Sequence, residues 1–284
     1  MIDEVHSSQS GEFSKSLKQT LSGEEQEEDE TIEEIIQKEI ESRGKQDHIS
    51  FFGFTGTPKN KTLQIFGTKN SDGNRVAFHS YEMRQSIDEG FTLDVLQHYT
   101  TYKRLFRLNE IASDKDKEVK KGKRQIMRYV DSDPKTIEAK VQVMLDHWIN
   151  FGSREIQGQA RAMIVVQSRK HCVQYFEEVN RQLEPHGHKA LVAFSGTVKM
   201  DGEEYTESGL NKTIGHEGNI PIGLKNPRYK ILIVSNKFQT GFDEPMLQSM
   251  YVDKALNGVQ CVQTLSRLNR TTRGKDRTFV LDFV

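Results

Sequence analysis

Residues 231–245 read Ile-Leu-Ile-Val-Ser-Asn-Lys-Phe-Gln-Thr-Gly-Phe-Asp-Glu-Pro, an apolar run that passes directly into a polar turn. A short apolar run of this kind is typical of a strand buried on both faces of a parallel sheet. The turn contains a glycine that permits close backbone approach, an acid two residues later and a proline that stops the element. The stretch therefore predicts a buried strand whose carboxyl end opens into a polar loop, although an ordinary turn is the simpler interpretation of the loop alone.

Short apolar runs of the same kind recur along the second half of the chain. They comprise residues 163–166, 191–194, 250–252 and 279–283. Helical patterns follow the first of them at 171–183 and precede the last at 259–269. Strands that alternate with helices predict an α/β domain with helices on both faces of a parallel sheet. Ligands of such sheets bind at the carboxyl ends of the strands, so we expect the functional residues there.

Residues 263–270, Gln-Thr-Leu-Ser-Arg-Leu-Asn-Arg, carry the most specific polar pattern of the chain. In a helix of about 100° per residue, Gln263, Arg267 and Arg270 fall on one face. Leu265 and Leu268 share a different face. The pattern predicts a helix whose leucines pack on a sheet while planar arginine side chains point at an oxygen-rich anion such as phosphate. A solvated polar face on an amphipathic helix is the alternative.

Length and composition indicate a globular protein with one large or two ordinary domains in 284 residues. The sequence contains no apolar run long enough to cross a bilayer, and its polar N-terminus does not resemble a secretory signal. The two cysteines, Cys172 and Cys261, lie far apart without metal-ligand spacing. This arrangement favours a reduced cytoplasmic protein over a disulfide scaffold.

The net charge of −1 conceals an asymmetry, because residues 1–50 hold 14 acidic and 5 basic residues, whereas the remainder holds 27 acidic and 35 basic. The mildly basic body permits a nucleic-acid partner. Residues 23–34 form an acidic run, which we interpret as part of a solvated insertion over about 23–42. Residues 113–128 form a basic stretch that we expect to be exposed, and 200–226 a long excursion between two strands.

Two short motifs near the N-terminus complete the set of candidates. Residues 55–58, Thr-Gly-Thr-Pro, end an apolar run, and their hydroxyl and backbone donors could relay a conformational signal. Asp3 and Glu4 are adjacent, and an acid pair at a strand end can hold a magnesium ion through one carboxylate and activate a water with the other. Each motif taken alone is also compatible with an ordinary turn or with two acids of no consequence.

In this order the motifs resemble motifs II to VI of superfamily 2 helicases and translocases. The matching stretches are Asp3-Glu4-Val5-His6, Thr55-Gly56-Thr57-Pro58, Ser168-Arg169, Thr240-Gly241-Phe242-Asp243-Glu244-Pro245 and Gln263 to Arg270. Five further stretches resemble the motor region of the R subunit of type I restriction enzymes more closely. They are residues 7–11, 89–96, 99–102, 192–196 and 250–254. The resemblance covers nearly the whole chain, and its last motif is highly specific when it is joined to residues 236–243.

The resemblance implies that ATP and Mg²⁺ are held between two RecA-like lobes. Asp3 would bind the magnesium ion, and Glu4 would polarise the attacking water. His6 would couple this site to Gln263 and Thr55 across the cleft. These roles follow from the family and not from the spacing of the residues.

The second lobe would supply the remaining groups of the same nucleotide site. Gly241 and Asp243 would lie near the γ-phosphate and the ribose. Arg267 and Arg270 would reach the nucleotide from the second lobe, with Arg270 as the arginine finger. The resemblance assigns the turn Thr55-Gly56-Thr57 to nucleotide binding as well.

The chain also departs from the family pattern. It contains no Gly-x-x-x-x-Gly-Lys-Ser/Thr loop, and only two residues precede Asp3. We therefore expect the phosphate-binding loop and a nuclease domain to lie upstream in a larger protein. The expected organisation is the C-terminal part of a first RecA-like lobe at 1–90, a connecting, partly helical region at 91–157 and a second lobe at 158–284.

The function that the resemblance implies is that of the ATP-dependent double-stranded DNA translocase motor in a type I restriction endonuclease. Its partners would be DNA and the modification (methyltransferase) and specificity subunits. One alternative is a non-catalytic nucleic-acid-binding module that keeps the lobe fold, and another is a related DNA remodeler or repair translocase. Retention of both acids and both arginines favours an active motor, and a nuclease-type carboxylate and lysine cluster upstream would distinguish the restriction subunit.

Overall fold

The computed structural model describes residues 52–102, 134–238 and 241–284, and the chain divides into two compact units at 1–82 and 83–284. The described part of the first unit contains helix α3 (Asn60–Phe66) and an antiparallel pair of short strands, β1 (Thr68–Lys69) and β2 (Arg75–Val76). Gly67 separates the helix from the hairpin. A side chain there would clash with the carbonyl oxygen of Leu63, so the tight exit from the helix requires glycine.

The second unit is organised around a six-stranded sheet in which every neighbouring pair of strands is parallel. Its spatial order is β3 (Tyr99–Thr101), β10 (Phe279–Asp282), β9 (Leu247–Asp253), β4 (Arg161–Val166), β8 (Tyr229–Val234) and β5 (Lys189–Ala193). Strands β4, β8 and β9 are buried along their whole length. These central strands are continuous apolar runs because helices or loops cover both of their faces.

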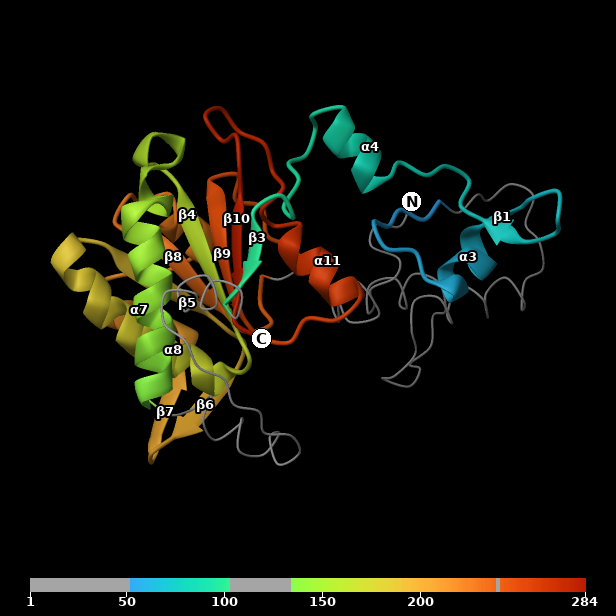
Figure 1. Cartoon of the computed structure of the whole chain (residues 1–284). Coiled ribbons are helices and arrows are strands. Elements are labelled where there is room, and N and C mark those ends of the chain that lie inside the picture. The colour runs from blue at the N-terminus through green and yellow to red at the C-terminus, as the bar shows by residue number, and fades with distance from the viewer. Residues whose placement is uncertain (1–51, 103–133, 239–240) are drawn as a thin grey trace, which may run out of the picture. The chain divides into compact units, whose positions relative to one another are not determined.

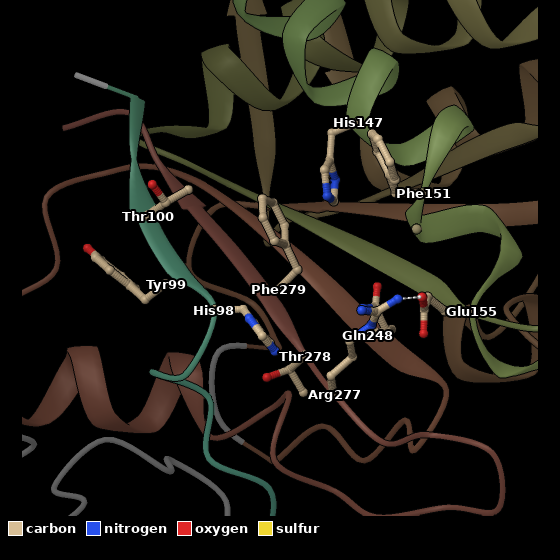
Figure 2. Close-up of a pocket in the computed structure, with 11 residues that line it drawn as sticks. His98, Tyr99, Thr100, His147, Phe151, Glu155, Gln248, Arg277, Thr278 and Phe279 are labelled. Atoms are coloured by element: carbon tan, nitrogen blue, oxygen red, sulfur yellow. Dashed lines mark hydrogen bonds and ion pairs between the residues drawn. The ribbon is translucent and has the colours of Figure 1, made fainter. Parts of the chain in front are cut away.

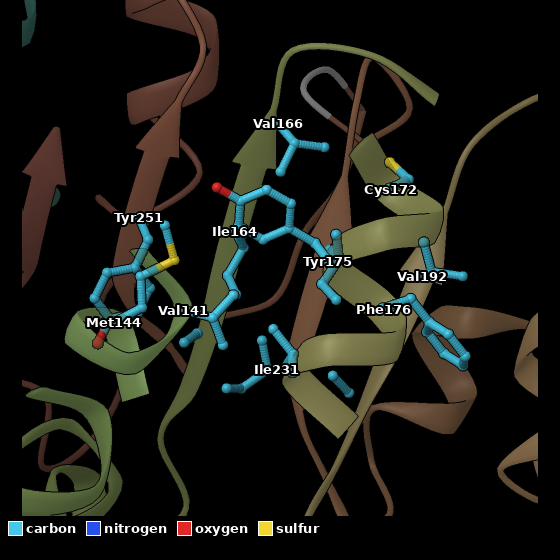
Figure 3. Packing of buried hydrophobic residues seen from close by; sticks show 14 of the residues in the cluster. Val141, Met144, Ile164, Val166, Cys172, Tyr175, Phe176, Val192, Ile231 and Tyr251 are labelled. Atoms are coloured by element: carbon cyan, nitrogen blue, oxygen red, sulfur yellow. The ribbon is translucent and has the colours of Figure 1, made fainter. Parts of the chain in front are cut away.

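One face of the sheet is covered by α7 (Pro134–Asn150), α8 (Arg169–Leu183) and α9 (Glu207–Thr213) (Figure 1). Figure 3 shows how Tyr175 and Phe176 of α8 and Met144 of α7 pack among side chains of the strands in this cluster. Helix α8 is preceded by the cap residue Ser168, whose hydroxyl oxygen accepts a hydrogen bond from the amide of His171 at 3.3 Å. This cap satisfies a donor that the first helical turn leaves without a partner.

The opposite face holds a second hydrophobic cluster beneath α11 (Val259–Leu265) and α10 (Ile220–Gly223). Leu265 and Leu268 enter this cluster beside Met163 and Met250 of the sheet. The remaining elements are short. They are α4 (Met83–Asp88), η1 (Gly152–Arg154), η2 (Ile156–Gly158), η3 (Glu184–His186) and the antiparallel hairpin of β6 (Thr197–Met200) and β7 (Glu203–Thr206).

The predicted α/β fold, a parallel sheet between helices, is confirmed. All five apolar runs are strands, and the helical pattern at 171–183 is α8. Strand β3 was not predicted, although it pairs with β10 at the edge of the sheet. Its three residues, Tyr-Thr-Thr, are too short and too polar to give an apolar signal.

The helix expected at 259–269 ends earlier than predicted, at Leu265. Arg267 and Arg270 therefore do not share a helical face with Gln263. Beyond the helix, Arg270 forms an isolated antiparallel bridge with Thr92, and the amide of Leu93 donates to the carbonyl of Asn269 at 2.9 Å. Pairing with this distant segment replaces the last helical turn.

Two other predictions concern the segments between strands. The excursion at 200–226 contains β7, α9 and α10 and is therefore largely regular. Residues 91–157, predicted as a connecting region, contribute β3 and α7 to the sheet unit. The acidic insertion at 23–42 and the basic stretch at 113–128 lie outside the described residues. No helix in the described part of the chain is long and apolar enough to cross a membrane.

Candidate functional site

The carboxyl ends of β8 and β9 are joined by a lysine. The side chain of Lys254, which follows β9, donates to the carbonyl oxygen of Ser235 at 3.1 Å and to the side-chain oxygen of Asn236 at 2.6 Å. Burial lowers the pKa of Lys254. The start of the loop after β8 is thus fixed by a charged donor from the neighbouring part of the sheet.

A carboxylate on α9 fixes the same loop from the other side. Both oxygens of Glu207 accept hydrogen bonds from the Lys237 ammonium, at 2.8 and 2.9 Å. One of these oxygens also accepts a bond from the amide of Phe194, which follows β5, at 2.8 Å. A single, mostly buried carboxylate therefore connects the ends of two strands, which gives the loop a defined path.

Asp253 at the end of β9 connects the sheet to the helices above it. Its carboxylate accepts bonds from Lys140 of α7 at 2.8 Å and from the Tyr175 hydroxyl of α8 at 2.6 Å. All three side chains are buried or nearly so. The charged groups at these strand ends are thus mutually satisfied, which favours a structural role for them.

The loop continues through Gly241 and Phe242 toward β9. Gly241 has φ +67°, a conformation that favours glycine, although no neighbour would touch an added side chain. Phe242 is buried, and its ring centroid lies 5.0 Å from that of Phe238. The buried ring anchors the loop and leaves the next residue, Asp243, exposed with 71% of its side chain accessible.

Arg267 is held by main-chain oxygens. Its guanidinium donates to the carbonyl of Phe242 at 2.9 Å and to the carbonyl of Gln263 at 3.1 Å. The first bond connects the residues after α11 to the loop after β8, and the second closes the end of the helix on itself. Arg267 therefore connects the predicted motif at 263–270 to the predicted motif at 240–245 through hydrogen bonds.

Arg270 is more exposed and makes a different contact. Its Nε lies 3.3 Å from the carboxylate of Asp243, with 44% of the arginine side chain accessible to solvent. Exposed ion pairs of this kind contribute little to stability, about 0 to 1 kcal/mol. A phosphate group could therefore replace the carboxylate as the partner of this guanidinium at small cost.

A buried lysine holds the backbone beneath Arg270. The Lys275 ammonium donates to the carbonyl oxygens of Pro245, Leu268 and Arg270 at 3.1, 2.8 and 2.7 Å. Burial lowers the pKa of Lys275 to about 7, while its three carbonyl acceptors act in the opposite direction because they favour the charged form. The lysine fixes the turn that carries Arg270 against the end of the loop that carries Asp243.

The structure thus brings together part of the predicted site. Gly241, Asp243, Arg267 and Arg270 lie in one cluster around the loop after β8, with Gln263 at the end of α11 beside them. Asp243 and Arg270 lie away from the carboxyl ends of the strands, because the loop has by then returned toward the start of β9. The expectation that the chemistry gathers at the carboxyl edge therefore holds only for the beginning of the loop.

The other predicted residues belong to the first unit or lie outside the described residues. In the turn Thr55-Gly56-Thr57, the amide of Thr57 donates to the hydroxyl oxygen of Thr55 at 3.1 Å. Asp3, Glu4 and His6 lie outside the described residues. Among the residues that are described, no group of three or more His, Cys, Asp or Glu side chains could hold a metal ion.

Sequence reasoning missed Lys275, Glu207 and Lys254. Each donates to or accepts from main-chain groups that are distant in sequence, so no local spacing indicates its role. A lysine after a glycine in a polar segment is typical of an exposed turn, yet Lys275 is 4% exposed. Only the return of the chain from α11 to β10 buries it.

Comparison with known proteins gives a consistent result. Residues 203–283 match the family model described as type I restriction enzyme subunit R domain 3. The HindI endonuclease subunit of Haemophilus influenzae is 26% identical over 247 residues, which cover 83% of this chain and 23% of that protein. The SauCOLORF180P endonuclease subunit of Staphylococcus aureus is 24% identical over 312 residues, 96% of this chain and 29% of that protein. The chain thus spans about a quarter of the length of these curated relatives.

Two solved structures are also similar. A putative HsdR subunit fragment of a type I restriction enzyme from Vibrio vulnificus has 17% identity and a TM-score of 0.47, covering 81% of this chain and 39% of that chain. The Type ISP restriction-modification enzyme LlaBIII bound to DNA has 14% identity and a TM-score of 0.45, covering 99% and 18%. By its sequence relatives and its family model, the chain is similar to one part of the endonuclease (R) subunits of type I restriction enzymes.

Proposed function

We propose that this chain forms the second lobe and adjoining segments of an ATP-dependent motor that translocates double-stranded DNA within a type I restriction enzyme. The R-subunit relatives and the order of the motifs support this proposal. The relatives are named as endonuclease subunits, so the translocation step is an inference of ours. The modification and specificity subunits would be its partners.

The observation that carries the proposal is the pairing of Arg270 with Asp243. The backbone of Arg270 is fixed by the hydrogen bond from Lys275 to its carbonyl oxygen and by its bridge to Thr92. Its guanidinium, in contrast, pairs with the exposed carboxylate of Asp243, which another anion could replace. A solvated polar face would need neither the buried lysine nor the bridge. The arrangement suits a cation that exchanges a resting carboxylate for a phosphate when the nucleotide binds.

ATP is the nucleotide that such a motor would hydrolyse, and Mg²⁺ when bound would neutralise charge on its phosphates. Arg270 and Asp243 fit the second-lobe side of such a site, as donor to phosphate and acceptor from ribose hydroxyls. Arg267 would orient the loop, because its guanidinium donates to the main-chain carbonyls of Phe242 and Gln263. The roles of Asp3 with the magnesium ion and of Glu4 with the attacking water remain predictions.

Exposed basic residues near the carboxyl edge of the sheet support DNA as the partner. Arg169 and Lys170 begin α8 and are exposed, and Arg169 donates to the carbonyl of Ser195 beyond β5 at 3.1 Å. Lys237 lies in the loop after β8 with 35% of its side chain accessible. These cations could contact phosphates without reading bases, as a motor that moves along DNA requires.

The test is DNA-stimulated ATP hydrolysis by the full-length enzyme that contains this chain, measured beside displacement of a third strand from a DNA triplex. We expect both activities in the parent protein and neither in a Glu4→Gln variant. The 284-residue chain alone should not hydrolyse ATP, because its sequence has no glycine-lysine phosphate loop. DNA binding that is unaffected by ATP, with no hydrolysis by the full-length protein, would instead establish a non-catalytic module.

A further inference from the structure

A cavity of about 350 Å³ opens at the amino ends of β3, β9 and β10 (Figure 2). The loop after β8, which begins at Ser235, starts from the opposite edge of the sheet. The cavity therefore does not overlap the contact between Lys254 and Ser235 at the carboxyl ends of the strands. Its volume is at the lower end of the range for small-ligand sites, about 300 to 1,000 Å³. None of the predicted nucleotide-site residues that the structure describes lines it.

One wall of the cavity is aromatic. The ring of His147 stacks on Phe279 with a centroid distance of 3.7 Å and an interplanar angle of 17°. Phe151 lies on the same wall, 5.7 Å from the His147 ring, and is 65% exposed. Figure 2 shows these three rings together on one side of the cavity. An accessible ring in such a column provides a face on which another flat ring can stack.

The wall carries no net charge. Burial lowers the pKa of His147 to about 4, so its imidazole is neutral near pH 7, and its Nδ1 is hydrogen bonded to the Tyr251 hydroxyl at 2.7 Å. The charged residues at the rim, Arg277 and Glu155, form an ion pair at 2.7 Å. The cavity therefore suits an uncharged ligand better than a phosphate or a carboxylate.

Two buried polar side chains of the cavity lining, apart from the aromatic wall, have unused hydrogen-bonding groups. The Thr278 hydroxyl is 1% exposed and has no partner among the described residues. Gln248 is 3% exposed. Its side-chain oxygen accepts a hydrogen bond from the Ser249 hydroxyl, which is the one side-chain hydrogen bond of Gln248 in the described part of the chain. Buried polar groups are normally hydrogen bonded, so the unpartnered Thr278 hydroxyl points to a ligand with polar atoms at its edge, and the Gln248 amide is a second group of the lining that could bond to it.

From these contacts we propose that the cavity binds one flat, uncharged heteroaromatic ring with hydrogen-bond donors and acceptors at its edge, which is the chemistry of a nucleobase. The ring would stack on the column of Phe151, His147 and Phe279. Its edge would bond to Thr278 and Gln248. None of the cavity residues belongs to the proposed nucleotide site around Arg270 and Asp243. The cavity can therefore bind such a ring whether or not the chain belongs to a motor.

The test is an NMR titration of the 284-residue chain, with labels on threonine methyl groups and histidine rings, using 9-methyladenine as the probe. We expect the signals of Thr278 and His147 to shift progressively and to saturate. Thr264, an equally buried residue of α11 that does not line the cavity, provides a reference methyl that should not move. No shift at Thr278 and His147 up to about 10 mM probe, or shifts confined to residues near Arg270, would overturn the assignment.

Variants make the test specific to the site. Phe151→Ala should weaken binding of the probe at least about fivefold, because stacking on an aromatic side chain contributes that much or more per base. Phe91→Ala removes a comparably exposed ring, 68% accessible, that does not line the cavity, so its affinity should stay within about twofold. Thr278→Val keeps the shape of the side chain and should weaken binding about threefold to tenfold through the lost hydrogen bond. Unchanged affinity in both cavity variants contradicts the proposal.

A free small molecule and an unstacked base of a single strand present the same ring. A hexamer of deoxyadenosine distinguishes these sources when it is titrated under the same conditions. Shifts at Thr278 and His147 with the hexamer would identify a base of a single strand, and shifts with 9-methyladenine alone would identify a free ligand. Both outcomes support the site, and the absence of both overturns it.

Discussion

The turn that carries Arg270 and the cavity beside His147 are built on opposite principles. Around Arg270, cations contact oxygen atoms of the chain, as in the three carbonyls bonded by Lys275 and the two bonded by Arg267. Around the cavity, rings stack on one another, and the one rim cation is neutralised by Glu155. One sheet unit therefore presents a charged surface whose last cation can change partners and an uncharged surface that can accept a ring.

This difference indicates how the same fold separates two kinds of recognition. In the arginine turn, rigid internal bonds fix the backbone, and only the Arg270 pair is exposed enough to exchange. In the cavity the fixed part is aromatic, and the unsatisfied part is the buried, neutral hydroxyl of Thr278. Each region also contains one buried basic side chain with a lowered pKa, and the two predict stability changes in separate ranges of pH.

The largest expected effect concerns Lys275. Its pKa in the folded chain, about 7, lies below the ordinary value of 10.5. Between these values the unfolded chain binds more protons, so the free energy of unfolding should rise with pH. The upper bound is about 5 kcal/mol, at about 1.4 kcal/mol for each unit of pKa, and the carbonyl acceptors reduce it.

Denaturant unfolding at pH 7 and at about pH 9.5 measures this contribution against Lys275→Met, in which it is absent. The exposed Lys212, which pairs with Glu217 on the surface, supplies a matched control as Lys212→Met. Equal changes of stability with pH in the parent and in Lys275→Met would show that burial does not lower the pKa of Lys275 in the folded chain.

A smaller effect belongs to the cavity and appears in acid. The pKa of His147 in the folded chain is about 4, below the ordinary value of 6.5, because of burial. Between these values the unfolded chain takes up a proton that the folded chain does not, so stability should fall as pH decreases from 6.5 toward 4. The loss should reach at most about 3.5 kcal/mol.

The measurement is the free energy of unfolding at pH 6.5 and pH 4.5 in the parent, in His147→Gln and in His98→Gln. His98 is an exposed histidine at the same cavity and serves as the control. We expect His147→Gln to lose less stability on acidification than the other two proteins. An identical loss in all three would remove the argument for a neutral imidazole in the cavity wall.

The smallest effect compares the two arginines of the turn. Arg267→Ala removes charged hydrogen bonds to the Phe242 and Gln263 carbonyls and should lower the free energy of unfolding by about 2 kcal/mol. Arg270→Ala removes an exposed pair and should lower it by no more than about 1 kcal/mol. Equal losses in the two variants, measured at neutral pH, would show that the division between a structural and an exchangeable arginine is wrong.

Much of the fold could be predicted because its central strands are apolar along their whole length. Runs such as 231–234 and 163–166 can be recognised without knowledge of their neighbours, and a parallel sheet follows from the helices between them. Strand β3 could not be predicted, since its three polar and aromatic residues become a strand only by pairing with β10. The end of α11 at Leu265 could not be predicted either. The segment at 92–93 that pairs with residues 269–270 in place of a last helical turn is far away in the sequence.

For the candidate site, the motif residues could be named from the sequence, but the contacts and the role of each one could not. Arg267 and Arg270 are the same residue type three positions apart, and only the structure shows that one bonds to carbonyls and the other to an exposed carboxylate. Lys275 gave no signal because its partners come from three separate positions of the backbone. The cavity was not predicted either, since its rings come from α7, β10 and the residues between α7 and β4.

The most direct test of the proposed motor is Arg270→Ala in the full-length enzyme, folded as judged by circular dichroism. ATP should bind with near-normal affinity, because binding rests mainly on the phosphate loop expected upstream. DNA-dependent ATP hydrolysis should fall at least about a hundredfold, since an arginine finger contributes about 10³ to 10⁵ in rate, and translocation should fail. Arg270→Lys should restore little, because a lysine lacks the planar fork. A hydrolysis rate for Arg270→Ala within about threefold of the parent would contradict the account.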